Sequence, residues 1–251
     1  FVHIMYPVAE CELADGLNPV ELNEGLEHRL IYGSYPEIIT TQSLEDKQRL
    51  IEHIADNYLF KDVLKIESIK NIALLERILK ALALQIGSEV SLNELARIVD
   101  ADKNTVKKYL DVCEKIFIVF SLPPFSNNKR KAIAKMKKYY FYDLGIRNAL
   151  LRQFQPLQLR NDTGALWENY FALERMKFNS AQKRYPHYYF WRSYQGQEID
   201  FLEESNGQLY GFECKWAKEL SLKHLKDIFT HDLGGKELTA VNKSNYANFI
   251  H

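Results

Sequence analysis

Hydrophobic residues recur at helical spacing through the first half of the chain. After Ser43, apolar residues follow three- and four-residue intervals over residues 50–59, and a second run of this kind covers residues 72–82, before Gly87. This spacing places apolar side chains on one face of a helix, and Ser and Gly are favoured at helix starts and ends, respectively. We therefore predict two amphipathic helices over residues 43–87.

The next stretch combines two short helical runs with two strand-like runs. Ser91 and Asp102 each precede apolar residues at helical spacing, with a three-residue turn over residues 100–102 between the runs. Two short amphipathic helices joined by such a turn are typical of a helix-turn-helix. Strand-like runs over residues 117–122 and 139–142 follow, separated by a basic stretch. This order of elements predicts a winged helix-turn-helix.

Basic side chains of this module are candidates for contact with DNA. A helix in the major groove presents its first residues to bases and phosphates. Six phosphates neutralised by the basic stretch would give a log–log salt slope of roughly −5. The alternatives are a solvated charged loop and a module that contacts only protein. The candidate residues are Lys103, Asn104, Thr105, Lys107 and Lys108 on the helix, and Lys129, Arg130, Lys131, Lys135, Lys137 and Lys138 on the basic stretch.

Two alternating runs flank Asn206-Gly207 in the last third of the chain. Asn-Gly between such runs is the strongest short-range signal for a β-hairpin. If these two residues form the turn, Ser205 pairs with Gln208. Counting outward then places Asp200 directly opposite Glu213, with Cβ atoms about 4.5–5.5 Å apart.

One face of this predicted hairpin is charged. Directly opposed carboxylates repel each other, and a divalent cation between them would remove the repulsion. Mg²⁺ takes one or two carboxylates together with waters and phosphate oxygens, and a bound metal can generate hydroxide. The alternative is a solvated face on which Glu198 pairs with Lys215. Alternation assigns Glu198, Asp200, Glu213 and Lys215 to the charged face, and Ile199, Phe201, Phe212 and Cys214 to the core face.

Composition narrows the class of protein. The 251 residues include 33 Lys and Arg against 33 Asp and Glu, so attraction to a polyanion must come from a local patch. A hydrophobic content of 46% predicts a packed globular chain. Cys11, Cys113 and Cys214 lack metal-ligand spacing, which favours a reducing cytoplasm. The longest wholly apolar run, residues 116–120, is too short to span a bilayer.

The charged residues near the hairpin resemble a known catalytic motif. Asp200 followed by Glu213-Cys214-Lys215 resembles the D…E-x-K core of the PD-(D/E)XK nucleases, with Ile199 where the motif has proline. The resemblance implies that Asp200 and Glu213 hold a metal and that Lys215 assists catalysis. A helix expected over residues 164–178 offers Glu168 in the place of that superfamily's helix-borne glutamate. The alternative for Glu168 is a solvated helix position.

The order of parts over nearly the whole chain resembles prokaryotic AAA+ ATP-binding proteins whose C-terminal half is a domain of unknown function. The chain opens in mid-pattern at Phe1, and we expect a fragment whose N-terminal ATPase module is missing. No G-x-x-x-x-G-K-[S/T] motif occurs in the sequence, so ATP would bind only in the missing part. The matching stretches are RLIYGSYPE (29–37), DNYLFKD (56–62), KNTVKKYL (103–110), YFYDLG (140–145) and GALWEN (164–169).

Together these features predict an α+β multi-domain chain. We expect the tail of a truncated AAA+ module at 1–42, a helical and winged-helix domain at 43–150, and an α/β PD-(D/E)XK (restriction-endonuclease-like) domain at 151–251. The expected function is that of a DNA-associated C-terminal region of an AAA+ ATPase, with DNA and the AAA+ module in cis as partners and no membrane partner. Oligomeric assembly is compatible with the sequence. The alternatives are an active Mg²⁺-dependent DNA endonuclease and a non-catalytic protein-interaction scaffold.

Overall fold

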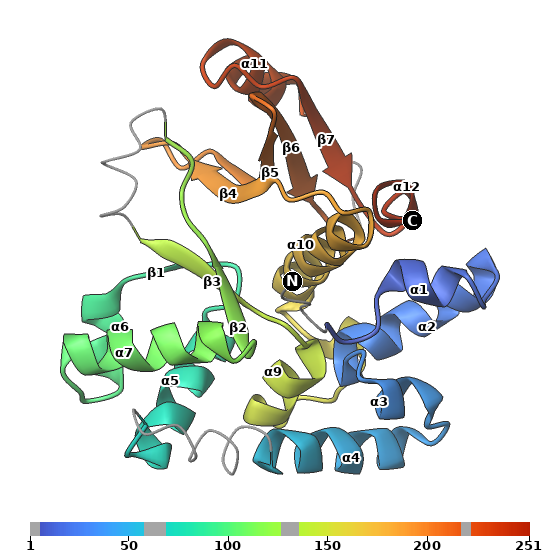
Figure 1. Cartoon of the computed structure of the whole chain (residues 1–251), viewed down its shortest axis with the longest axis vertical. Helices are drawn as coiled ribbons and strands as arrows, with labels where there is room; N and C mark the ends of the chain where they lie inside the picture. Colours follow the sequence, from blue (N-terminus) through green and yellow to red (C-terminus); the bar gives the residue numbers. More distant parts are fainter. Residues whose placement is uncertain (1–5, 58–68, 127–135, 217–221) are drawn as a thin grey trace. The chain divides into compact units, whose positions relative to one another are not determined.

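The computed structural model describes residues 6–57, 69–126, 136–216 and 222–251. The chain is a mixed α and β fold with a three-stranded and a four-stranded sheet (Figure 1). It divides into two compact units, residues 1–121 with 139–161 and residues 122–138 with 162–251. Within the described ranges, no helix combines the length and the apolar content that crossing a bilayer requires.

Helices form most of the first unit. Helix α9 packs against α2, α4 and α5, and the core between them contains Leu30, Ile51 and Ile78. The predicted cap at Ser43 is confirmed, since its side chain accepts a hydrogen bond from the N–H of Asp46. The helices are α1 (Glu10–Ala14), α2 (Pro19–Tyr32), α3 (Pro36–Thr40), α4 (Leu44–Asp56), α5 (Ile72–Leu84) and α9 (Leu144–Leu151), followed by a 3₁₀ turn (Leu157–Leu159).

The predicted pair of short helices is present as α6 (Leu92–Ile98) and α7 (Lys103–Lys115). Ser91 and Asp102 cap them, as the sequence predicts: the Asp102 carboxylate accepts from the N–H of Asn104 at 2.8 Å. Strands β1 (Glu89–Val90), β3 (Lys137–Phe141) and β2 (Val119–Leu122) form the three-stranded sheet in that order. The two short helices are thus followed by two paired strands, joined through residues that are not all described.

The second unit contains the four-stranded sheet. Its strands are β4 (His187–Arg192), β5 (Glu198–Ser205), β6 (Gln208–Cys214) and β7 (Glu237–Val241), and its helices are α10 (Thr163–Ala181), α11 (Lys223–His231) and α12 (Ala247–Ile250). The strands lie in the order β4-β5-β6-β7; neighbours are antiparallel except β6 and β7, which are parallel. Parallel neighbours need a crossover, and α11 provides it. Residues 206–207 adopt positive φ angles of 52° and 73°, and Ser205 pairs with Gln208 as predicted.

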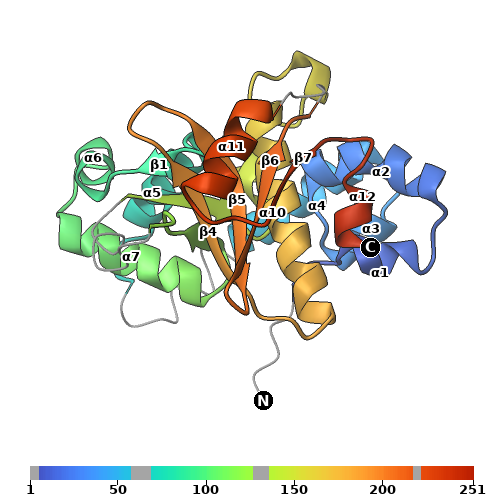
Figure 2. The same ribbon diagram turned by 90° about the horizontal axis from the view of Figure 1, so that it is seen from above.

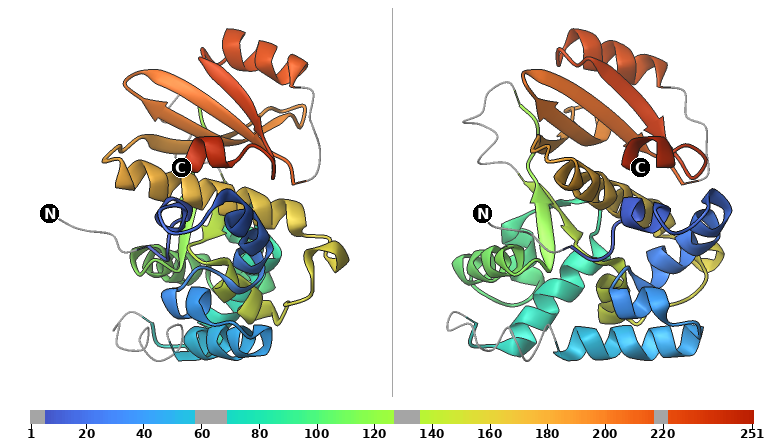
Figure 3. Two further views of the ribbon diagram at one scale, coloured as in Figure 1. Left: turned by 90° about the vertical axis from the view of Figure 1, so that its right-hand side faces the viewer. Right: turned by 45° about the vertical axis from the view of Figure 1, so that its right-hand side comes forward.

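Helices α10 and α11 cover opposite faces of this sheet (Figure 3). Phe171 of α10 contacts Phe212 with ring centroids 5.3 Å apart. Phe229 of α11 is fully buried in a cluster with Leu202 and Leu238. Seen from above, α11 lies across the strands (Figure 2). The strands that carry the predicted charged residues are therefore sandwiched between two hydrophobic layers.

The strict alternation predicted for residues 199–201 is wrong. Ile199 belongs to the core cluster with Leu202, whereas Phe201 contacts Phe171 of α10, on the other face. The pairing of β4 with β5 shifts register between Tyr189 and Trp191. A β-bulge inserts an extra residue and breaks the period of two. Counting residues outward from the hairpin turn therefore assigns side chains to the correct face of the sheet only up to this irregularity. Asp200 lies at the irregularity.

Candidate acidic site

Strands β5 and β6 bring Asp200 and Glu213 close to the same end of the hairpin. The β5–β6 ladder ends at the pair Phe201 and Phe212, and Asp200 and Glu213 lie next to this pair on the adjacent strands. Asp200 is only 6% exposed and Glu213 5%. The Asp200 carboxylate accepts a hydrogen bond from the N–H of Cys214 at 2.8 Å. This bond fixes one carboxylate oxygen in the space between the strands.

Lys138 contacts three carboxylates. We call these three side chains, Glu168, Glu198 and Asp200, the acid cluster. The Lys138 Nζ lies 2.9 Å from Glu168 Oε1 and 4.0 Å from Asp200 Oδ1, and it also pairs with Glu198. The Lys138 side chain is 1% exposed, and its Nζ lies 5.4 Å from the centroid of the Phe190 ring. One ammonium group therefore holds three acidic side chains of the same unit together.

Glu213 pairs with Lys215 instead. The Lys215 Nζ lies 2.9 Å from Glu213 Oε1, and 42% of the Lys215 side chain is exposed. The other oxygen, Glu213 Oε2, is buried and has no hydrogen-bond partner. Burial raises the pKa of Glu213 to about 7; the charge of Asp200 adds to this effect, and Lys215 opposes it. Glu213 is thus a buried carboxyl group with a pKa near neutrality and one unused oxygen.

The charges of Asp200 and Lys138 are set by opposing effects. Burial raises the pKa of Asp200, against the charges of Lys138 and Lys215 and the Cys214 N–H. For Lys138, burial lowers the pKa, but the carboxylates of the acid cluster outweigh it and the net shift is upward. Lys138 consequently remains an ammonium ion, as a buried counter-charge must.

These positions do not match the set expected for a Mg²⁺ site. The acid cluster converges on Lys138, and Glu213 is held by Lys215. Across residues 6–57, 69–126, 136–216 and 222–251, no group of three or more His, Cys, Asp or Glu side chains is placed to hold a metal ion. The unused oxygen of Glu213 is a single ligand, whereas Mg²⁺ is commonly bound through one or two carboxylates with waters and phosphate. As arranged, the residues do not fit a resident divalent cation.

Two of these residues have roles that the sequence did not reveal. Lys138 was predicted to contact DNA, but its buried ammonium group is bound to carboxylates and is not available to phosphate in this structure. Glu198 was predicted to pair with Lys215 in the solvated alternative, but it pairs with Lys138 and, at 3.9 Å, with Arg192. Lys138 precedes Glu168 by 30 residues, and no local pattern signals a contact over that separation.

The N-terminal half of α7 presents four of its five predicted DNA-contacting residues to solvent. Lys103, Asn104, Lys107 and Lys108 are exposed and Thr105 is half-buried. Lys107 forms an exposed ion pair with Asp111 at 2.8 Å. Lys137, on β3, is half-buried. The remaining candidates, Lys129, Arg130, Lys131 and Lys135, lie outside the described residues.

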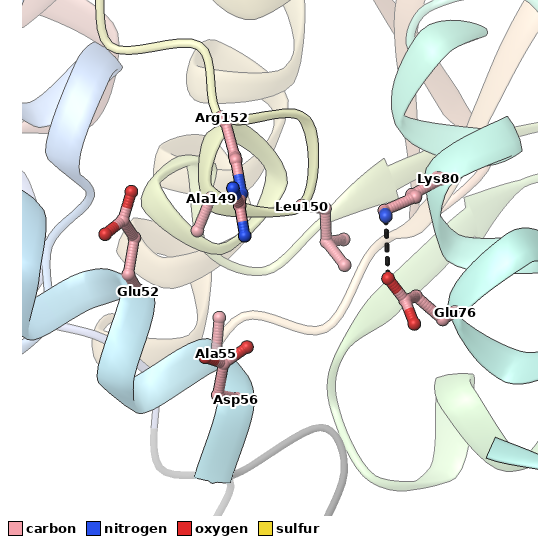
Figure 4. Close-up of a pocket in the computed structure, with 8 residues that line it drawn as sticks. All are labelled: Glu52, Ala55, Asp56, Glu76, Lys80, Ala149, Leu150 and Arg152. Carbon is pink, nitrogen blue, oxygen red and sulfur yellow. Dashed lines mark ion pairs between the residues drawn. The ribbon is translucent and has the colours of Figure 1, made fainter. Parts of the chain in front are cut away.

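A separate pocket lies in the first unit, between α4, α5 and α9 (Figure 4). Acidic and basic side chains both line it. On the α5 wall, Lys80 Nζ lies 2.6 Å from Glu76 Oε1. None of the predicted site residues lines it. The lining residues are Glu52, Ala55, Asp56, Glu76, Lys80, Ala149, Leu150 and Arg152.

Two stretches of the chain match known families. Residues 23–157 match the family described as "Domain of unknown function (DUF8612)". The chain belongs to this family. Residues 163–246 of this DUF8612 protein match a second description, "Domain of unknown function (DUF4143)". The second match contains Glu168, Glu198, Asp200 and Glu213 but not Lys138.

Relatives of this DUF8612 protein occur in bacteria and in a methanogen. It is 31% identical over 203 residues to uncharacterized proteins of Mycobacterium tuberculosis and Mycobacterium bovis, which covers 80% of this chain and 45% of each relative. It is 24% identical over 258 residues to an uncharacterized protein of Methanocaldococcus jannaschii, covering 93% of this chain and 56% of the relative. The chain thus spans about half the length of these relatives. No solved structure gives a significant match.

Proposed function

We propose that this chain is the DNA-associated C-terminal region of an AAA+ ATP-binding protein, in which a winged helix contacts DNA and a nuclease-like unit does not cleave it. The observation that carries the proposal is the outer face of α7. Lys103, Asn104 and Lys108 are exposed there, while Val106 and Leu110 bury the opposite face. A helix start that carries exposed lysine side chains suits phosphate, because their ammonium groups can contact its oxygens.

The family matches support the AAA+ part of the proposal. DUF4143 domains are commonly found in the C-terminal region of AAA-ATPase-associated proteins. The relatives are about twice as long as the matched region, which leaves room for an ATP-binding module in cis. Any ATP hydrolysis by the parent would occur in that module.

The nuclease-like part of the proposal is supported by the order of the charged residues along the second unit. Helix α10 carries Glu168, the hairpin carries Asp200 and Glu213, and Lys215 follows two residues later. This is the order that the PD-(D/E)XK resemblance implies. The arrangement of the acid cluster around Lys138 favours a unit that retains the fold without metal-dependent cleavage.

Fluorescence anisotropy with a labelled DNA duplex at several salt concentrations tests the proposal. We expect salt-sensitive binding that weakens about tenfold in the double variant Lys103→Ala/Lys108→Ala. Lys115→Ala is the matched control, because Lys115 is exposed at the far end of the same helix and should leave binding unchanged. Absence of DNA binding at low salt would leave the protein-interaction scaffold. Plasmid cleavage with Mg²⁺ that is lost in Lys215→Ala would establish the endonuclease instead.

A further inference from the structure

We propose that the ammonium group of Lys138 is the resident cation of the acid cluster, so that this unit neutralises its buried acidic centre with its own side chain instead of a divalent metal. The inference concerns the second unit alone and does not depend on whether α7 contacts DNA. It goes beyond the proposed function because it assigns a specific role to Lys138, which lies within the first family match and outside the second.

The geometry around Lys138 resembles the coordination of a cation by several anionic ligands. Glu168 reaches it from helix α10, and Glu198 and Asp200 reach it from the first part of strand β5. Their side chains are 13%, 26% and 8% exposed. An ammonium group donates three hydrogen bonds and carries one positive charge, so it can serve several carboxylates at once.

Electrostatics explains why a cation is needed at this position. Carboxylates gathered in a buried place repel one another and lose hydration, which disfavours their charged forms. Apart from Lys138, Glu198 meets the partly exposed Arg192 at 3.9 Å. Asp200 receives the Cys214 N–H and is also near the charge of the partly exposed Lys215. Lys138 is therefore the principal buried positive charge of the cluster among the described residues.

A divalent cation could enter only at the expense of this arrangement. A metal bound to Asp200 and Glu168 would lie next to the Lys138 ammonium, and two positive charges at that separation repel strongly in a buried setting. If the carboxylates turned from Lys138 to the metal, the buried ammonium would lose its partners, which is also costly. The lysine and the metal are thus mutually exclusive occupants of the cluster.

Mn²⁺ binding, followed by electron paramagnetic resonance of the free ion, tests the proposal on the whole chain. We expect wild type and Lys138→Arg to retain no Mn²⁺ at this cluster, and Lys138→Met to bind Mn²⁺ at least tenfold more tightly. The gain should disappear when Asp200→Asn is added. Wild-type binding of Mn²⁺ that Asp200→Asn abolishes would overturn the proposal, as would a folded Lys138→Met variant with no gain.

A second measurement applies if Lys138→Met does not fold. Adding Glu168→Gln and Glu198→Gln removes two of the charges that Lys138 neutralises, while keeping the side-chain shapes. Circular dichroism should then show recovery of folded structure in the triple variant. Failure to recover would overturn the assignment of Lys138 as the counter-charge. These outcomes are separate from the DNA-binding assay on α7, so failure of one proposal can be told from failure of the other.

Discussion

The carboxylate of Asp143 accepts a hydrogen bond from the backbone N–H of Ser34 at 2.7 Å, across 109 residues of sequence. Its other oxygen caps α9 by accepting from the N–H of Ile146 at 3.1 Å. Asp143 and Ser34 lie in two of the stretches on which the AAA+ resemblance rests. Within the first unit, this carboxylate therefore ties the two stretches together.

Replacing Asp143 by alanine should destabilise the first unit by about 2–4 kcal/mol, because two buried N–H groups lose their acceptor. Chemical denaturation followed by circular dichroism measures this loss. Asp143→Asn keeps one acceptor oxygen and should fall between wild type and Asp143→Ala. Equal stability of the alanine variant and wild type would contradict the role assigned to this carboxylate.

Gly33 makes room for the same carboxylate. It has a φ of +85°, and a Cβ at this position would lie 2.0 Å from Asp143 Oδ1. Gly207 is the matched control, since its φ is +73° but nothing lies within 4 Å of its Cβ position. Gly207→Ala should cost about 1 kcal/mol for backbone strain, and Gly33→Ala about 2 kcal/mol more for the clash. Similar melting temperatures for the two variants would contradict this account.

Glu213 should make stability depend on pH. Its pKa is raised from 4.5 to about 7, so the folded chain keeps a proton there that the unfolded chain releases. The stability contributed by this residue is therefore fully present below about pH 4.5 and is lost as the pH rises through about 7. Glu213→Gln should reduce the difference in unfolding free energy between acidic and neutral pH by about 2 kcal/mol.

Denaturation curves at pH 5 and pH 8 would measure this difference for Glu213→Gln. Glu237→Gln provides the control, because Glu237 is exposed on the neighbouring strand β7 and should keep the wild-type slope. An unchanged slope in Glu213→Gln would show that its carboxyl group titrates as it does in water.

Arg175 links helix α10 to the sheet and to the C-terminal segment. Its guanidinium donates to both oxygens of Glu203, at 2.8 and 2.9 Å, and to the carbonyl of Phe249. Lysine cannot reproduce this planar fork, so Arg175→Lys should cost on the order of 2 kcal/mol. Arg192→Lys should change stability by less than about 1 kcal/mol, because Arg192 is 45% exposed. Thermal denaturation of both variants compares them directly.

DNA binding by α7 should carry a measurable salt signature. Each lysine that neutralises a phosphate contributes about −0.9 to the log–log slope of affinity against salt. Lys108→Ala should therefore make the slope shallower by about that amount. If affinity falls while the slope stays the same, Lys108 acts through the structure of α7 and not through a phosphate.

Local signals in the sequence predicted many elements of the fold. Asn206-Gly207 fixed the hairpin register because both residues readily adopt positive φ. Asp102 marked the start of α7 because its carboxylate accepts free N–H groups of the first turn. Features that depend on such neighbouring residues can be recognised without coordinates.

Long-range contacts were not predictable in this way. The bulge that separates the faces of Ile199 and Phe201 arises from pairing with β4, which no count from the hairpin turn reveals. Lys138 resembled its basic neighbours in the sequence, yet it is buried against Glu168 and Asp200. Tertiary packing decides whether a lysine contacts DNA or a carboxylate. The sequence alone does not distinguish the two cases, because the lysine carries the same charge in both.

The interleaved path of the chain between its two units limits how the protein can be dissected. A gene fragment encoding residues 162–251 would retain the four-stranded sheet but lose Lys138, together with Pro123 and Phe125, whose backbones hydrogen-bond to Phe190. Its acidic side chains would then face one another without their lysine. Metal uptake or instability measured on such an excised piece would report the missing counter-charge and not a property of the intact polypeptide.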